Sequence, residues 1–501
     1  MIKASTNDSD SMEDSLPSQS ETQTSKRLDL THDRLSELPD LALTRILSHL
    51  FCHEAAKPPS YRNVSTHSGI TSPYSAFPTQ IVAKIDKFSV KFRYDLLRKN
   101  SVDEWVNFAL RKKVKCLCLN FVQKAVKNHV PFTIVKGIEY DLPDFVFDDG
   151  NLVELVTRRC RFSTDALINW NSLRKLSISR TKLSEGLISR VLCGCPVLET
   201  LELKEWSGFD KLKIDSGSLR VLRIIEEQVP NYVIEHHDNC LMEISGPNLV
   251  SLEVSGSLWR TKLRLSDVGC LINATMDFEI KPQAQLFGGD LKLSWLETRD
   301  QDIIREVLES LSFVKTLTVG GWCIKALSSC EAYNLSSPRS ERRSLNLCIS
   351  LIKWDNHGIA SLLESSPYLE TLAIKLSHCS NKLPCAVVHD SNSICDEYYW
   401  KSWSTISKCP VLHLKKVEVI NFPESCELIK ILFQFLQFLL RNSRFLEEIV
   451  IQASKHMTRE TINEAMKLLA VSTASPDAVV LFEPAHFWVD TGLYDLYLRE
   501  D

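Results

Sequence analysis

A short apolar motif recurs along the chain from Ile85 onward. In each copy, two apolar residues are separated by two positions, and a third apolar residue follows after one more position. The last two therefore alternate with their neighbours, which is the pattern of a strand with one buried face. Thr157 replaces the third apolar residue in one copy. The motif predicts strands at the copies led by Ile85, Val114, Leu152, Leu173, Leu198, Leu219, Leu249, Val314, Leu369, Leu414 and Leu446.

Apolar residues at helical spacing lie between several of these copies. Segments 187–192, 303–311 and 359–363 each carry apolar residues three or four positions apart and precede a predicted strand. A single helix–turn–strand unit cannot bury both of its apolar faces, but stacked neighbours can. We therefore predict an α/β protein, an irregular leucine-rich-repeat horseshoe with parallel strands inside and helices outside. The horseshoe is called irregular because the copies lie from about twenty to well over thirty residues apart.

Composition narrows the class of protein further. The 501 residues have a net charge of −4 and no basic signature, so nucleic acid is not an expected partner. No apolar run is long enough for a membrane span, so no membrane partner is expected either. The N-terminus lacks the order of a signal peptide, and the sixteen cysteines are expected to be reduced, mostly buried and unbridged. We expect the protein in the cytoplasm, the nucleus or both.

The first eighty residues follow a different pattern from the repeats. Residues 1–30 are rich in Ser, Thr, Asp and Glu and are expected to be a disordered leader. A helix is predicted from Pro39, which suits the first helical position, to Leu50. Leu43, Ile46, Leu47 and Leu50 would share one face of it, and Leu35 and Leu38 can fold over that face.

The stretch DRLSELPDLALTRILSHL, residues 33–50, resembles the first half of an F-box, a helical module that docks on a Skp-type adaptor of a cullin ubiquitin ligase. The segment 51–80 contains Pro58, Pro59, Pro73 and Pro78 and is predicted to be a loop, so the second half of the F-box is missing or unrecognisable. An incorrect exon junction and a real divergence both explain this pattern.

The repeats resemble those of plant F-box/leucine-rich-repeat proteins, in phrases such as IDKFSVKFRYD, CGCPVLETLEL and LKKVEVINF. Residues 409–483 resemble the FBD module at the end of such chains, with a helix over 426–442 whose apolar stripe is expected to be core. Composition and the resemblance together divide the chain into a leader (1–30), a partial F-box (31–50), a loop (51–80), repeats (81–408), an FBD-like module (409–483) and a tail (484–501).

The resemblance implies a substrate-recognition subunit of an SCF-type ligase, bound to a Skp-type adaptor and through it to a cullin. The alternative is a repeat-based scaffold with a degenerate F-box. The adaptor would bind the apolar helix face, formed by Leu35, Leu38, Pro39, Leu43, Ile46, Leu47 and Leu50.

An unidentified protein target is expected to bind the concave face of the sheet. The side chains between the apolar positions of each strand should point there, since neighbours along a strand alternate. Charge reversal at Lys175, Glu202 and Arg223 is expected to weaken target capture and to leave the thermal midpoint nearly unchanged. The candidates are Lys175, Ser177, Thr200, Glu202, Val221, Arg223, Thr371 and Ala373.

Motifs that carry catalysis are missing from the sequence. It contains no Gly-rich phosphate loop, G-x-S-x-G elbow or H-E-x-x-H. The pairs Cys116/Cys118 and Cys193/Cys195 have the wrong spacing for zinc, and His236-His237 has no third ligand near it. Short basic runs at 111–113, 158–159 and 339–343 are best explained as solvated faces. We therefore predict no catalytic residues, no metal site and no cofactor.

Overall fold

The structure is a computed structural model that describes residues 85–122, 138–163, 166–206, 208, 211–226, 241–258, 262–280, 298–332, 337–349, 355–376, 400, 411–422, 426–452, 467 and 471–483. The predicted leader, partial F-box, loop 51–80 and tail 484–501 lie outside these residues, as do His236 and His237. The proposed domain boundaries therefore stay predictions.

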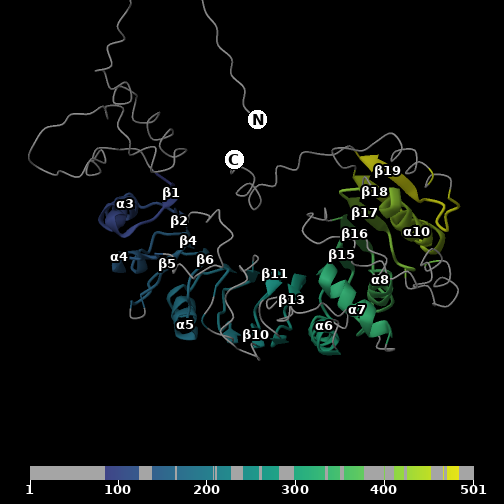
Figure 1. Ribbon diagram of the computed structural model, residues 1–501, viewed down its shortest axis with the longest axis horizontal. Coiled ribbons are helices and arrows are strands. Elements are labelled where there is room, and N and C mark those ends of the chain that lie inside the picture. Colours follow the sequence, from purple (N-terminus) through teal and green to yellow (C-terminus); the bar gives the residue numbers. More distant parts are fainter. Residues whose placement is uncertain are drawn as a thin grey trace, which may run out of the picture.

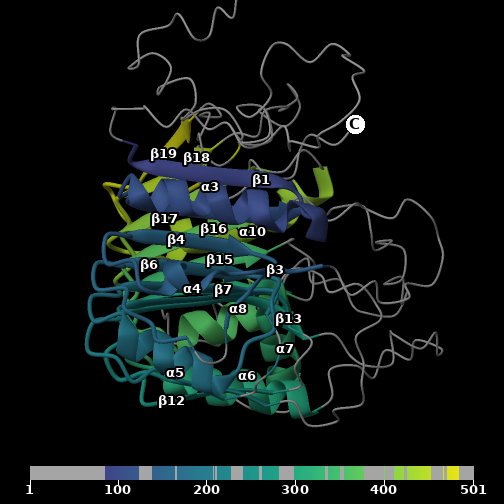
Figure 2. The ribbon, with the colours of Figure 1, turned by 90° about the vertical axis from the view of Figure 1, so that its left-hand side faces the viewer.

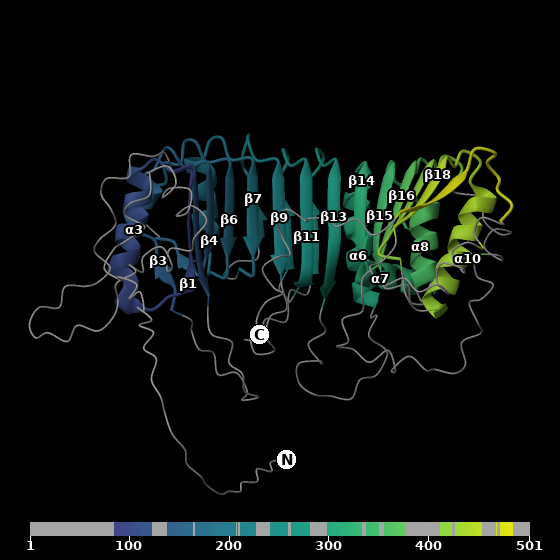
Figure 3. The same ribbon diagram turned by 90° about the horizontal axis from the view of Figure 1, so that it is seen from above.

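One curved parallel sheet organises the described chain (Figure 1). It has 14 strands in the order β1-β2-β4-β6-β7-β9-β11-β13-β14-β15-β16-β17-β18-β19, which confirms the predicted horseshoe class. Figure 3 shows the strands side by side from above. Their bounds are β1 Lys87–Arg93, β2 Cys116–Val122, β4 Glu154–Arg158, β6 Lys175–Ser179, β7 Thr200–Lys204, β9 Val221–Glu226, β11 Ser251–Leu258, β13 Asn273–Ile280, β14 Thr316–Gly320, β15 Ser344–Ile349, β16 Thr371–Leu376, β17 Lys416–Ile420, β18 Glu448–Gln452 and β19 Val479–Glu483.

The register of the sheet stacks the apolar motif of one repeat on that of the next. Leu176 of β6 pairs with Leu201 of β7, which pairs with Leu222 of β9, and all three are fully buried. The first apolar residue of each copy, such as Leu173 or Leu198, lies just before its strand and is buried as well, except Ile85, which is partly buried. Stacking of this kind supplies the core that a single repeat could not form alone.

Helices cover the outer side of the sheet at both ends of the arch (Figures 1 and 2). In α5, Leu187, Ile188, Val191 and Leu192 are buried as their spacing predicts, and the Ser184 hydroxyl caps the helix by accepting the Leu187 amide at 3.2 Å. The helices are α3 Lys99–Arg111, α4 Asp144–Phe147, α5 Glu185–Gly194, α6 Thr298–Ser310, α7 Gly321–Ala332, α8 Asp355–Glu364 and α10 Cys426–Asn442, with a 3-10 turn, η1, at Leu96–Arg98. None of these helices is long and apolar enough to cross a membrane.

The outer side of the sheet is built differently in the middle of the chain, between the predicted helical segments 187–192 and 303–311. There, β8 Lys211–Lys213, β10 Leu241–Ser245 and β12 Lys262–Ser266 form a separate three-stranded parallel sheet in the order β12-β10-β8. Their apolar residues alternate, as Met242 and Ile244 or Leu263 and Leu265 do, and this period of two favours strands over helices. A two-stranded sheet, β3 Tyr140–Asp141 with β5 Cys160–Arg161, occupies a similar outer position.

The sequence motif did not predict three strands of the large sheet, β13, β15 and β19. Ala274 in β13 is a small residue where the motif expects a large apolar one, and Arg342 stands where the copy that leads into β15 would begin. The third, β19, has exposed apolar residues, with Val479 51 % exposed, because it is the last strand of the sheet.

The C-terminal elements continue the sheet. Strands β17 and β18 pair in parallel with each other and, through β16, with the preceding repeats. The predicted helix over 426–442 is confirmed as α10, whose Leu432, Leu436 and Leu439 are fully buried. The region that resembles an FBD module therefore adds its strands to the horseshoe.

The cysteine expectation is half right. The eight cysteines whose side chains the structure describes are free thiols, as predicted. Among these eight, Cys160, Cys195 and Cys323 are buried and the other five are partly or fully exposed, so the expectation of mostly buried cysteines is wrong for these eight. Cys116 and Cys118 alternate with the core residues of β2 and so lie on the opposite face of the strand.

Candidate binding face

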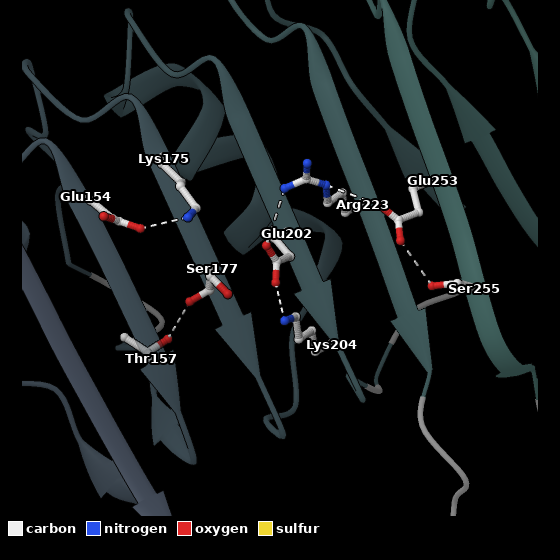
Figure 4. Close-up of polar contacts among 9 residues, drawn as sticks. All are labelled: Glu154, Thr157, Lys175, Ser177, Glu202, Lys204, Arg223, Glu253 and Ser255. Atoms are coloured by element: carbon white, nitrogen blue, oxygen red, sulfur yellow. Dashed lines mark hydrogen bonds and ion pairs between the residues drawn. The ribbon is translucent and has the colours of Figure 1, made fainter. Parts of the chain in front are cut away.

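The concave face of the sheet is lined by the residues between the apolar positions of each strand. Lys175 pairs in register with Thr200, which pairs with Val221, and Ser177 pairs with Glu202, which pairs with Arg223. Figure 4 shows Lys175, Ser177, Glu202 and Arg223 on the side of the sheet away from the helices. The strand alternation thus brings five of the predicted target-binding residues, with Val221, into two adjacent rows.

The remaining candidates lie elsewhere on the same face. Thr371 and Ala373 are on β16, which is separated from β9 by β11, β13, β14 and β15. Alternation along the strand predicts correctly that they lie on the concave face. The structure places four strands between them and Arg223, so they do not form one cluster with Lys175 and Arg223.

The charged candidates are bound to one another and to neighbours that the sequence analysis did not single out. The Lys175 ammonium lies 2.8 Å from Glu154 Oε1. The Arg223 guanidinium lies 3.2 Å from Glu253 Oε2 and 3.9 Å from Glu202 Oε2 (Figure 4). Glu154 and Glu253 occupy the same alternating positions as the predicted residues, which is the signal that could have identified them.

Glu202 is the most enclosed member of this network. Its side chain is 6 % exposed, and its carboxylate also pairs with Lys204 on the same strand. Ser177 beside it is 5 % exposed, and the Ser177 carbonyl accepts a hydrogen bond from Thr157 Oγ1 at 3.3 Å. Glu202 is therefore a structural anion that joins β7 to β9, while the outer parts of Lys175 and Arg223 stay accessible.

The charge network alters the acidity of its own groups. Although partial burial opposes ionisation, the hydrogen bond and charge of Lys175 lower the pKa of Glu154. The thiol of Cys116 donates to Glu154 Oε2 at 3.5 Å, and burial together with the Glu154 charge raises the pKa of Cys116 to about 12. This thiol is protonated at neutral pH, which makes it a poor nucleophile and a poor metal ligand.

Neutralising Glu202 is expected to destabilise the protein more than neutralising Lys175. Glu202→Gln removes a buried carboxylate from two cations and should cost about 1.5 kcal/mol, the scale of a hydrogen bond to a charged group. Lys175→Gln breaks a half-exposed pair and should cost less than about 1 kcal/mol. Urea denaturation midpoints of the two variants measure the difference, and equal midpoints would contradict it. Charge reversal at Glu202 is therefore not expected to leave the thermal midpoint unchanged.

Metal ligands do not gather in the part of the chain that the structure describes. No group of three His, Cys, Asp or Glu side chains there could hold a metal ion. The predicted adaptor-binding residues, from Leu35 to Leu50, lie outside that part.

Comparison with known proteins shows which family models and proteins this chain is similar to. A model described as "FBD-associated F-box protein At5g56370, LRR repeats" matches residues 102–262. The match confirms the predicted resemblance to plant F-box/leucine-rich-repeat proteins.

The putative F-box/LRR-repeat protein At5g02930 of Arabidopsis thaliana is 23 % identical over 465 residues, which cover 88 % of this chain and 91 % of that protein. A second putative Arabidopsis F-box/LRR-repeat protein, At3g28410, is 25 % identical over 432 residues, or 84 % of each chain. The F-box/LRR-repeat protein At3g03360 is 25 % identical over 317 residues, which cover 60 % of this chain and 58 % of that protein. The F-box/leucine-rich-repeat resemblance favours a role in substrate recognition.

Proposed function

We propose that this F-box/leucine-rich-repeat chain is the substrate-recognition subunit of an SCF-type ubiquitin ligase. Residues 33–50 dock on a Skp-type adaptor, and the adaptor links the chain to a cullin. The concave face of the repeats holds a protein target. The observation that carries the proposal is the open polar face of the 14-stranded sheet, joined in one chain to a stretch that resembles an F-box.

The chain is proposed to have no catalytic role in this assembly. Ubiquitin transfer takes place on other subunits, so the recognition subunit needs no nucleophile of its own. The thiols of the concave face fit this assignment, because burial raises the pKa of Cys348 to about 11, as it does for Cys116. We place the protein in the cytoplasm, the nucleus or both.

Adaptor binding is expected to be weaker than that of a complete F-box. The sequence has the apolar residues Leu38, Ile46, Leu47 and Leu50, but the prolines of the segment after them predict a loop there in place of the further helices of an F-box. Burying a large aliphatic side chain contributes about 1.5–3 kcal/mol. Two absent helices therefore reduce the affinity by roughly a hundredfold.

A pull-down with purified Skp-type adaptor tests the coupling. The wild type should capture adaptor faintly, the double variant Ile46→Asp with Leu47→Asp should capture none, and a chimera with a complete F-box should capture it strongly. Leu97→Asp is the matched control, because Leu97 is 96 % exposed on the repeat domain and should leave capture unchanged. Wild-type capture no higher than that of the double variant would favour the adaptor-free scaffold.

A further inference from the structure

The concave face changes character between β11 and β17. On one side lie the paired charges of Lys175, Glu202 and Arg223, and on the other side Lys416 pairs with Glu418 and Glu448. Between them, the two adjacent register rows on β13 to β16 carry only uncharged and mostly small side chains. We call these residues the neutral strip: Asn273, Thr275, Thr316, Thr318, Ser344, Asn346, Thr371 and Ala373.

The neutral strip offers hydrogen-bond donors and acceptors of both kinds. Asn346 Nδ2 donates to Thr318 Oγ1 at 3.1 Å, which leaves the Asn346 carbonyl oxygen and the Thr318 hydroxyl proton directed elsewhere. The side chains of Thr275, Thr318 and Asn346 are half-buried and in register with one another. Such a surface can satisfy the alternating amides and carbonyls of an extended polypeptide.

In the register row beside the neutral strip, an acidic residue lies at one end and a basic residue at the other. Asp277 is on β13 and Lys375 is on β16, and only Gly320 and Cys348 lie between them. Both charged side chains are exposed. Neither of them forms an ion pair within 4 Å among the described residues, whereas the charged residues Lys175, Glu202, Arg223 and Lys416 of the same face all do.

The two residues between Asp277 and Lys375 are small, so no bulky side chain stands between the two charges. A Cβ on Gly320 would lie 2.1 Å from Asp277 Oδ1, so the Asp277 carboxylate rests over the glycine. Cys348 adds only a neutral thiol, whose pKa is raised by burial and by Asp277. Three strand spacings separate β13 from β16, which is roughly 14 Å. That span equals about four residues of an extended chain.

We propose that the neutral strip binds an extended polypeptide segment of the target, with a basic side chain on Asp277 and an acidic side chain on Lys375 about four residues apart. The inference rests on the proposed recognition function and names the kind of segment that the face accepts. A simple anion is disfavoured by Asp277, and a neutral glycan leaves both charges without a partner. Opposite charges on one extended segment satisfy the whole row.

The test is selection of a displayed random peptide library on the full-length chain. The wild type should enrich peptides that carry a basic and an acidic residue about four positions apart, in one fixed order. The double variant Asp277→Lys with Lys375→Asp should enrich the reverse order. The matched control is Lys315→Glu with Glu341→Lys, which swaps an exposed pair 3.0 Å apart that already neutralises itself and should enrich the wild-type order.

Affinity measurement completes the test. By fluorescence anisotropy, a peptide selected on the wild type should bind the Asp277/Lys375 double variant at least about tenfold more weakly. The milder variants Asp277→Asn and Lys375→Gln should each weaken binding several-fold, which covers the case in which the double variant fails to fold. No enrichment, enrichment of uncharged peptides, or the same order on both chains would overturn the proposal. Adaptor capture depends on residues 33–50, so its failure is a separate result.

Discussion

Replacing Arg342 by leucine is expected to stabilise the protein by about 3 kcal/mol. Arg342 is 1 % exposed, and its Nε, Nη1 and Nη2 atoms have no hydrogen-bond partner. Burial lowers the pKa of Arg342 from 12.5 to about 10, which corresponds to a penalty of about 3 kcal/mol at neutral pH. A hydrophobic replacement for a buried ion is commonly neutral or stabilising for this reason.

Leucine should fit at position 342, because the equivalent positions of the neighbouring repeats hold buried apolar residues. Arg342 precedes β15 exactly as Val314 precedes β14 and Leu369 precedes β16, and both of those residues are buried. The backbone is equivalent too: the Arg343 amide donates to the Lys315 carbonyl at 2.9 Å, as the Lys315 amide donates to that of Ile272 at 3.0 Å. The leading place of the motif is therefore already formed around an arginine.

Urea denaturation of Arg342→Leu beside Arg343→Leu measures the effect. Arg343 is the neighbouring arginine, exposed and paired with Glu370 at 2.7 Å, so its replacement should cost less than about 1 kcal/mol. In the parent protein the penalty should also shrink as the pH rises above about 10, because the folded state releases the Arg342 proton before the unfolded state does. A loss of stability in Arg342→Leu would show that the guanidinium has a favourable role.

Arg342 also helps to explain why the sequence motif did not predict every strand of the large sheet. The motif found every strand whose copy has large apolar residues in its first two places, because burial on one face demands that pattern. It missed β15, where Arg342 takes the leading place, and β13, where Ala274 is small. Those substitutions are tolerated because parallel neighbours on both sides hold the strand in register.

The candidate face was predictable in part for a related reason. Alternation along a strand told which residues point to the concave side, so Lys175, Glu202 and Arg223 were identified. Their partners Glu154 and Glu253 stand at the same alternating positions, but only the order of the strands shows that they lie beside Lys175 and Arg223. Asp277 remained unnoticed since it belongs to β13, a strand that the motif missed, and its relation to Lys375 depends on the order of four strands.

A methyl group added at Gly358 is expected to destabilise the protein by about 3 kcal/mol. Gly358 lies in the first turn of α8 at its contact with α7, where its amide donates to the Ser328 hydroxyl at 2.8 Å. A Cβ there would lie 2.2 Å from the Ile324 carbonyl oxygen and 2.9 Å from Ser328 Oγ. The two helices would have to separate, and overpacking of this kind costs 1–3 kcal/mol, with backbone clashes at the upper end of about 3.

Gly186→Ala provides a control of opposite sign. Gly186 is also in the first turn of a helix, α5, but it is exposed and a Cβ there meets no atom within 4 Å. Alanine should stabilise α5 by a few tenths to about 1 kcal/mol, because it removes the backbone freedom of glycine in the unfolded chain. Denaturation midpoints should therefore move in opposite directions for the two alanine variants. Equal shifts would mean that helix propensity, rather than the close approach of α7 and α8, determines the need for glycine at position 358.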